Sequence, residues 1–565
     1  MRAKLSMLPY LILATMMIGA FSASVVFAHS VNTSAVQANS STMSAIPASA
    51  PLVSMHTVDM SRVPAASPAS VHGIVKEQPI TGVSPAIYAQ RKAAAAHNPA
   101  APVNVHPSTN SPSIPSSPTL LTSFNGQEDS ASTCPYWGGC EHPDMALATS
   151  SSWVFQGVNE AYAVYDTHGN LQSGWPKNYV PFFGVPAVGS CDSNGPYMVD
   201  PRAFYDPVDQ RFWAVTLQDE GAFGYNNCPF ASLFWIAVSQ TNNPNGKWNV
   251  YSFDMARGTS FAADYTEAGF NQKAVFFTSN MLNKTSANFI YAEAFAASKA
   301  GMEAGQSVTA KGFTDLKAGG TVVDSVQPVE KMQESGSEFL VSSFNINSGG
   351  GSCVSGCSGI AVWAFANPTT TPQLTEVTVP TSTYTMPPKA DEPGHSAFIE
   401  TFDTRIGGSP VYQSGLLSFS FETGVNNGHQ VVPGIFWGQI KPTLSNGKIT
   451  GATLTQSGLF NYSGDQDASY SALGSDANGH LLMAFVTMSS SINPTIMYAT
   501  HTSANAPGTL STPVKLIQSS SPKVQSFYGD YSNTSFDGST TNDVWFAAEY
   551  VSTSDWNTYI GEVHF

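Results

Sequence analysis

Short apolar stretches alternate with polar turns along most of the chain after about residue 119. Residues 212–217 and 544–550 are dense in aromatic and small apolar side chains, and each stretch follows a turn rich in Asp, Pro, Gly or Asn. Runs of this length bounded by turn residues are typical of β-strands. The pattern therefore predicts an all-β protein.

A longer unit repeats along these strands: a polar opening residue, a strand, a turn and a second apolar strand. Its clearest copy opens at Asp530, turns near Asp537 and ends in residues 544–550. Successive opening residues lie 56, 64, 63, 76, 64 and 63 positions apart, and the longest step contains the Pro/Thr-rich stretch 367–393. The seven opening residues are Asp144, Asp200, Asp264, Gln327, Asp403, Asp467 and Asp530.

The length of this repeat, together with the number of strands in it, distinguishes between the possible all-β architectures. Later apolar stretches in each unit, such as residues 233–239 and 360–365, bring the count to about four strands per repeat. A β-helix would repeat over a much shorter length, and tandem sandwiches would need no common period. The sequence predicts a β-propeller of seven four-stranded blades. Pairs such as Phe212-Trp213 and Trp545-Phe546 are then expected to lie between blades.

The first 118 residues have a different composition. Residues 1–28 combine a basic start, an apolar run and the small-residue end Val26-Phe-Ala28, which predicts a secretory signal peptide. A retained membrane anchor is the alternative that the length of the run permits. Residues 29–118 are rich in Ala, Ser and Pro and predict a disordered linker or a propeptide. Within them, Arg91-Lys92 starts either a short helix or a processing site. The propeller domain is expected over residues 119–565.

The chain carries six cysteines, all beyond residue 118. With export, an even number favours disulfides over a metal site. Close spacing suggests two of the pairs and elimination the third, although six cysteines allow fifteen connectivities. The suggested pairs are Cys134 with Cys140, Cys353 with Cys357, and Cys191 with Cys228.

The chain has few charged residues, and most of them are acidic. Only 11% of residues are charged, against roughly 25% in an average soluble domain, and the net charge is −16. A nucleic-acid binder needs a clustered basic face, so nucleic acids and anionic membrane surfaces are excluded as partners. Few paired carboxylates also suggest tolerance of an acidic habitat. The alternative is the ordinary composition of an extracellular β-protein.

Several ordered motifs together resemble a family of secreted bacterial β-propeller proteins of largely uncharacterised function. They include Asp200-Pro, Arg211-Phe-Trp213, Gly529-Asp-Tyr-Ser532 and Glu549-Tyr550, and the similarity runs from about residue 123 to the last residue. The resemblance implies the propeller fold and export, but it brings no established catalytic residues. The turns are also faintly similar to sialidase Asp-box hairpins, although the full pattern is absent and no arginine triad can be assigned.

If the repeat holds, the opening residues converge on the funnel at one end of the blades. Carboxylates gathered there repel one another and have raised pKa values unless a cation or basic side chains intervene. Arg202 and Arg405 are placed to be those partners. The predicted ligand-binding residues are Asp200, Arg202, Asp264, Tyr265, Asp403, Arg405, Asp467, Asp530 and Tyr531.

Two other interpretations of the opening residues stay open. A Ca²⁺ ion held by carboxylates and carbonyls is one, with Asp144, Asp200, Asp264, Asp467 and Asp530 as the expected ligands. In the other interpretation, the role is purely structural: each Asp caps a loop by accepting hydrogen bonds from backbone N–H groups, and the Asp-Tyr pairs serve only in packing.

These features predict a secreted or cell-surface monomer that binds an extracellular glycan or protein at its funnel face. The alternative is an extracellular polysaccharide hydrolase or lyase that uses funnel carboxylates. Its candidate catalytic residues are Asp264 and Asp530, with His395 as a possible general base. No nucleophile elbow, phosphate-binding loop or zinc helix is found, and fold alone does not decide, because propellers host both enzymes and binding proteins.

Overall fold

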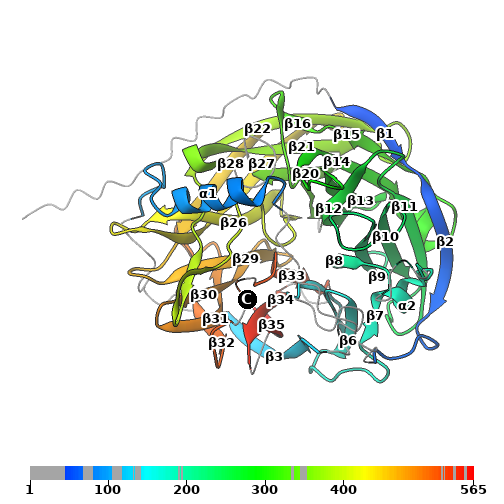
Figure 1. Cartoon of the computed structure of the whole chain (residues 1–565), viewed down its shortest axis with the longest axis horizontal. Coiled ribbons are helices and arrows are strands. Elements are labelled where there is room, and N and C mark those ends of the chain that lie inside the picture. Colours follow the sequence, from blue (N-terminus) through cyan, green and yellow to red (C-terminus); the bar gives the residue numbers. More distant parts are fainter. Residues whose placement is uncertain are drawn as a thin grey trace, which may run out of the picture. The chain divides into compact units, whose positions relative to one another are not determined.

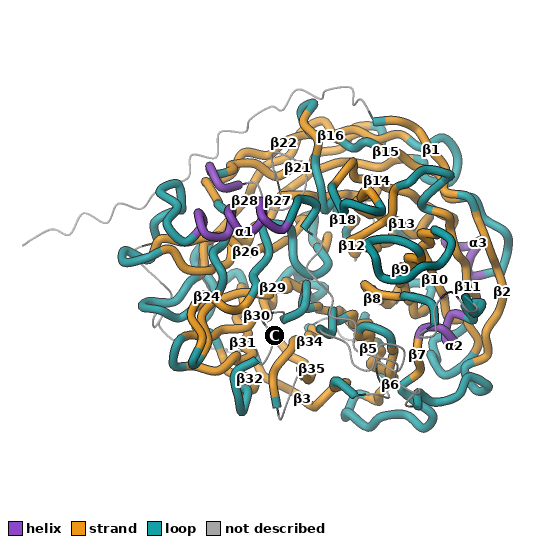
Figure 2. Tube along the Cα trace, viewed as in Figure 1, coloured by secondary structure: helices purple, strands orange, loops and turns teal. Residues whose placement is uncertain are grey.

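Seven sheets are arranged around a central axis as the blades of a β-propeller (Figure 1). The structure is a computed structural model, and its described residues all lie in one unit, Ala35–Phe565. They are residues 45–67, 81–104, 118–130, 133, 142–188, 191, 195–331, 336–343, 353–523, 526, 528–538, 542–552 and 556–565. Strands dominate this part of the chain and helices are few and short (Figure 2). The predicted fold class is confirmed.

In blades 1 to 6, four antiparallel strands follow one another in sequence from the innermost outward. Blade 1 holds β4 (Ala146–Thr149), β5 (Trp153–Val158), β6 (Ala161–Asp166) and β7 (Lys177–Asn178). Blade 2 holds β8 (Met198–Asp206), β9 (Arg211–Glu220), β10 (Ala231–Ser239) and β11 (Lys247–Asp254). Blade 3 holds β12 (Phe261–Phe270), β13 (Ala274–Asn283), β14 (Phe289–Ser298) and β15 (Ala310–Thr314).

The next three blades have the same order. Blade 4 holds β18 (Gln327–Pro328), β20 (Glu338–Ser343), β21 (Cys357–Ala366) and β22 (Gln373–Tyr384). Blade 5 holds β25 (Val411–Gln413), β26 (Leu416–Asn426), β27 (Val431–Ser445) and β28 (Lys448–Phe460). Blade 6 holds β29 (Asp467–Ser475), β30 (Leu481–Ser489), β31 (Ile492–His501) and β32 (Val514–Gln518).

Blade 7 closes the ring with strands from both ends of the propeller. Its strands are β33 (Asn533–Phe536), β34 (Asp543–Val551), β35 (Trp556–His564) and, outermost, β3 (Thr119–Glu128). The pairing of β3 with β35 places Phe124 opposite Ile560. Because β3 precedes blade 1 in sequence, this pairing joins the first blade to the last.

Smaller elements lie between the blades. Strand β19 (Glu330–Lys331) runs parallel to both β12 and β25 and so links the sheets of blades 3 and 5. The remaining elements are the hairpins β16 (Lys317–Ala318) with β17 (Thr321–Val322) and β23 (Ala390–Glu392) with β24 (His395–Ile399), the helices α1 (Pro85–Ala95), α2 (Tyr179–Phe183) and α3 (Lys299–Glu303), and a 3₁₀ turn at Cys353–Ser355. None of the described helices combines the length and the apolar character needed to cross a membrane.

Each interface between neighbouring blades is filled by a hydrophobic cluster of described residues. Successive strand residues point to opposite faces of a sheet, so one apolar pair serves two interfaces. Trp213 lies between blades 2 and 3, whereas its neighbour Phe212 lies between blades 1 and 2. Trp545 lies between blades 7 and 1, and Phe546 between blades 6 and 7. The expected position of these pairs is confirmed.

Part of the segment predicted to be a disordered linker is ordered. Strand β1 (Ile46–Ala50) adds a fifth strand to blade 3, and β2 (Leu52–Asp59) adds one to blade 2. The prediction of disorder was wrong for these strands, because pairing with an open sheet edge uses backbone groups and needs few large apolar side chains. It was also wrong for α1, where Tyr88 and Lys92 both contact the buried Glu400. Arg91 and Lys92 lie inside α1, as the helix alternative requires. Removal of residues 29–118 as a propeptide stays a prediction.

Two of the three predicted disulfides are confirmed. Cys191 is bonded to Cys228 and Cys353 to Cys357, with Cα–Cα distances of 5.0 and 5.3 Å. The pair predicted between Cys134 and Cys140 lies outside the described residues, and so does the signal peptide over residues 1–28.

Buried carboxyl groups predict that the protein is more stable in acid than at neutral pH. Burial raises the pKa of Glu330 to about 8, and that of Glu422 to about 7. Between an unfolded pKa near 4.5 and these values, the folded protein holds protons that the unfolded chain releases. The free energy of unfolding should therefore fall as the pH rises through this window, by roughly 1.4 kcal/mol per pH unit for each such group.

Urea unfolding measured from pH 4 to pH 8 checks this expectation. The wild-type protein should lose stability steadily over the range, and the Glu330→Gln variant, which cannot release a proton there, should lose less. An unchanged slope in the variant, or stability that rises with pH, would contradict the prediction.

Candidate functional site

The inner end of every blade carries one residue in the left-handed backbone conformation. Such a conformation is uncommon outside glycine and bends the chain sharply. In blades 2, 3 and 6 the bend coincides with a β-bulge between the first two strands. The seven bend residues are Asp144, Asp200, Tyr265, Ser325, Phe402, Tyr470 and Gly529, with φ between 46° and 86°.

These bends, and not the acidic residues, mark the equivalent positions of the repeat. Asp200 occupies its bend, Asp264 precedes one, and Asp403 and Asp530 each follow one. Asp467 stands three residues before the bend of blade 6, and the structure does not bring it to the other acids. The predicted alignment of the repeats was wrong at Asp467 because it placed acidic residues at equivalent positions. The direction of a side chain is set by the backbone geometry and not by the residue type.

Side chains two positions after the bends meet at the propeller axis. Arg202, Glu267, Gln327 and Tyr531 all have this offset. Arg202 is ion-paired with Glu267, and both are buried. The Arg202 guanidinium lies 3.4 Å from the centroid of the Tyr531 ring, a cation–π contact. Contacts between blades 2, 3 and 7 of this kind are possible only where the blades converge.

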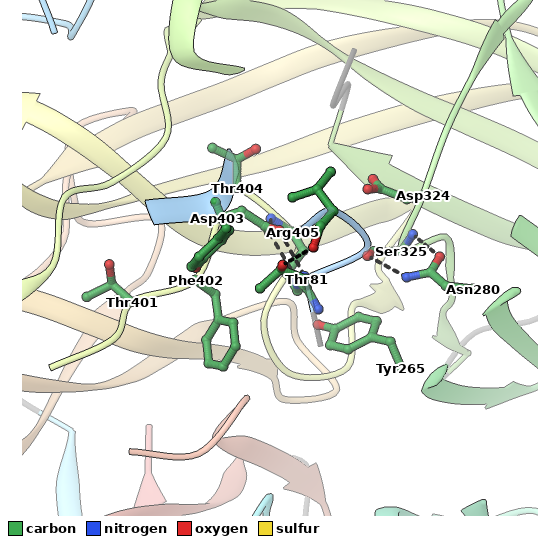
Figure 3. A network of polar contacts seen from close by, with 12 residues as sticks. Thr81, Tyr265, Asn280, Asp324, Ser325, Thr401, Phe402, Asp403, Thr404 and Arg405 are labelled. Carbon is green, nitrogen blue, oxygen red and sulfur yellow. Dashed lines mark hydrogen bonds and ion pairs between the residues drawn. The ribbon is translucent and has the colours of Figure 1, made fainter. Parts of the chain in front are cut away.

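A second buried ion pair extends this centre from blade 5. Arg405 donates from Nε and Nη2 to the two carboxylate oxygens of Asp403, at 2.9 and 2.8 Å (Figure 3). Its guanidinium lies 4.5 Å from the Tyr265 ring centroid. The Tyr265 hydroxyl and the Gln327 amide both donate to the carbonyl of Ile406, at 2.9 and 2.6 Å. We call Arg202, Glu267, Tyr265, Arg405 and Tyr531 the funnel floor.

Three acids around the floor are only partly buried. Asp200, Asp264 and Asp530 come from blades 2, 3 and 7, and we call them the rim acids. Burial and the neighbouring Asp200 raise the pKa of Asp264 well above its ordinary value, against the opposing charge of Arg405. Burial and the neighbouring Asp144 likewise raise the pKa of Asp530. The predicted convergence of carboxyl groups is thus found for these three residues, with Arg405 as a basic neighbour.

Asp144 lies behind the rim and is fully buried. Its carboxylate accepts from the backbone N–H of Asp530 at 2.6 Å and from Asn159 Nδ2 at 2.9 Å, and His142 Nδ1 lies 3.0 Å away. Burial opposes ionisation, but His142 and these hydrogen bonds lower the pKa of Asp144. Asp144 is therefore a charged structural anchor for the rim.

One cluster at this place has the composition of a cation site. Ligand atoms of His142, Asp144 and Asp530 all lie within 4.8 Å of one another. Oδ1 of Asp530 is buried and has no hydrogen-bond partner among the described residues. A histidine in the set suits a transition metal better than Ca²⁺, which prefers oxygen ligands. The Ca²⁺ site stays a prediction, and Asp467 is not part of this cluster.

His395 is not gathered at the funnel. It lies on β24 with a half-exposed side chain, where its ring stacks on Phe398 at 4.6 Å and its Nδ1 lies 3.6 Å from Glu392. Its predicted role as a general base has no support from this position.

Three residues of the site were not predicted from the sequence, namely Glu267, His142 and Asn159. Glu267 shares its position two residues after a bend with Arg202 and Tyr531, and this shared position becomes visible once the bends are known.

Comparison with known proteins identifies no family and finds only weakly similar structures. No protein-family model and no curated protein matches the chain. Among solved structures, the Hadza microbial sialidase Hz136 is similar at a TM-score of 0.37 and 10% identity, over 75% of this chain and 65% of that one. Trypanosoma rangeli sialidase is similar at 0.31 and 8%, over 74% and 57%. The exo-β-1,3-galactanase of Phanerochaete chrysosporium is similar at 0.29 and 8%, over 79% and 99%. Scores this low carry no argument about activity.

Proposed function

We propose that the protein is a secreted or cell-surface propeller that binds an extracellular glycan at its funnel face. The observation that carries the proposal is the set of rim acids, three partly exposed acidic residues from three blades around an ordered floor. Ionised carboxyl groups accept hydrogen bonds from sugar hydroxyls, and protonated ones also donate. Held on different blades, the three groups can contact several hydroxyls of one sugar unit.

The charges of the floor favour an uncharged glycan. Arg202 is ion-paired with Glu267 and Arg405 with Asp403, so both guanidinium groups are engaged within the protein. An anionic ligand would meet the rim acids and a chain of net charge −16. The two disulfides support an oxidising compartment, which is where such glycans occur. The protein would act there as a monomer.

Glycoside hydrolysis is the second candidate, and the raised pKa of Asp264 favours it. A carboxyl group that keeps its proton near neutral pH can protonate a leaving oxygen, provided that a second carboxylate stays ionised close by. Asp200 is the acid with the largest electrostatic effect on Asp264, followed by Asp530 and Asp219. In this scheme Asp264 is the general acid.

A glycan array and a turnover screen on the protein without residues 1–28 test both candidates. The Asp264→Asn and Asp530→Asn variants should each lower the affinity for an array hit at least tenfold, about 1.4 kcal/mol. Asp465→Asn, at an exposed acid outside the rim, should leave it unchanged. Binding without turnover supports the first candidate, and turnover abolished by Asp264→Asn supports the second. Unchanged binding in both rim variants would contradict both.

A further inference from the structure

A cavity of about 610 Å³ lies between α1 and blades 5 and 6. Some residues of three segments far apart in sequence line it, within 89–97, 388–397 and 429–433, together with Asp467 at the start of β29. None of its lining residues belongs to the funnel floor or to the rim acids. Figure 1 shows α1 lying across this side of the propeller, near β26 and β28. The cavity is therefore a separate feature of the surface.

The polar wall of the cavity is held in place by hydrogen bonds. Asp467 is only 3% exposed, and its Oδ2 accepts from the backbone N–H of Asp391 at 2.7 Å. Oδ1 of Asp391 accepts from the N–H of Ala397 at 2.5 Å and from the hydroxyl of Ser396 at 3.3 Å. Burial raises the pKa of Asp467 well above its ordinary value, which favours the protonated form of this carboxyl group. The wall thus offers fixed donors and acceptors.

The cationic groups of the cavity are compensated within the protein. Lys92 Nζ lies 3.0 Å from Glu400 Oε1 and also donates to Thr401 Oγ1 and to the carbonyl of Phe402, at 2.7 and 2.6 Å. Lys389 Nζ lies 3.2 Å from the other oxygen of Glu400. Glu400 is thus shared by two ammonium groups, and the lining also holds the acidic residue Asp391, so cationic and acidic groups are present in equal number and neither sign dominates.

Part of the lining is apolar. Ala89 and Ala93 of α1 and Ala96 at its C-terminal cap line the cavity beside Lys92 and His97, and Pro388 and Pro433 line it from the propeller. Alanines at this helical spacing form a smooth strip, against which the C–H faces of a sugar ring can lie. Fixed polar groups and apolar residues in one lining match the two kinds of surface that a sugar presents.

We propose that this cavity is a second binding site, separate from the funnel, that takes a short uncharged oligosaccharide. Its volume lies in the range of small-molecule sites, roughly 300 to 1,000 Å³. Asp467 and Asp391 hydrogen-bond the hydroxyl groups, and the alanine strip contacts the ring carbons. The proposal does not depend on what the funnel binds.

Saturation-transfer NMR and calorimetry with maltotriose, cellotriose, xylotriose and triacetylchitotriose test the site. At least one trisaccharide should bind, and Ala93→Trp, which fills the cavity, should weaken that binding at least tenfold. Ala94→Trp is the matched control, because Ala94 is exposed on the same helix but does not line the cavity. Asp264→Asn in the funnel should leave this binding unchanged.

Asp467→Ala is a second variant that should also weaken the binding, and thermal unfolding shows whether each variant is folded. The proposal is overturned if none of the four trisaccharides binds. It is equally overturned if folded Ala93→Trp and Asp467→Ala bind as the wild type does, or if Asp264→Asn alone abolishes binding, because the sugar would then sit in the funnel.

Discussion

Replacing Arg202 by methionine should lower the free energy of unfolding by about 3–5 kcal/mol. Arg202 is 1% exposed and Glu267 is 2% exposed, so the substitution leaves a carboxylate buried without its ion-pair partner. It also removes the hydrogen bond from Arg202 Nε to the carbonyl of Thr266, at 2.9 Å, and the contact with the Tyr531 ring. Urea unfolding monitored by tryptophan fluorescence measures the loss.

The double variant Arg202→Met with Glu267→Met is the control for this prediction. Removing both charges avoids the uncompensated carboxylate, so the double variant should be more stable than Arg202→Met alone. If the single variant lost less than 1 kcal/mol of unfolding free energy, the ion pair would not be a major source of stability for the funnel floor.

Replacing Lys92 by methionine should release α1 from the propeller. Lys92 is 4% exposed, and its ammonium lies against Glu400 and the carbonyls of Pro387 and Phe402. Without it, Glu400 keeps the hydroxyl of Tyr88 but loses its buried cationic partner, a loss of about 3 kcal/mol or more. Amide hydrogen exchange in α1 should accelerate at least 100-fold, because opening of this segment then costs far less.

Lys389→Met is the matched control, since Lys389 contacts the same carboxylate. Its side chain is 34% exposed, and a partly exposed ion pair contributes about 1 kcal/mol or less. Exchange in α1 should therefore change little in this variant. Equal acceleration in the two variants would contradict the assignment of Lys92 as the residue that anchors α1.

The blades could be predicted because their determinants are local. Seven repeats of similar length and apolar pairs such as Phe212-Trp213 follow from strand periodicity, which is written directly in the sequence. The pairing of β1 and β2 with blades 3 and 2 was missed because edge pairing depends on backbone groups that every residue carries. Residues 46–59 mix apolar, polar and proline residues within a segment rich in Ala, Ser and Pro, so they were not recognised as strands.

The site was predicted in part. Four predicted residues do meet at the axis, because each lies next to or near the opening residue of a repeat in the sequence. They are Arg202, Tyr265, Arg405 and Tyr531. Asp467 was misplaced because a bend three residues later, at Tyr470, sets the register, and a left-handed tyrosine has no reliable sequence signature. Glu267 was overlooked because its role depends on contact with another blade, which spacing alone does not reveal.

A crystal of the protein soaked with the glycan selected on the array tests the central claim most directly. The account predicts a sugar with hydroxyl groups within hydrogen-bond distance, about 2.6–3.2 Å, of carboxyl oxygens of Asp200, Asp264 and Asp530. A glycan found only elsewhere on the propeller, with the three rim acids untouched, would contradict it.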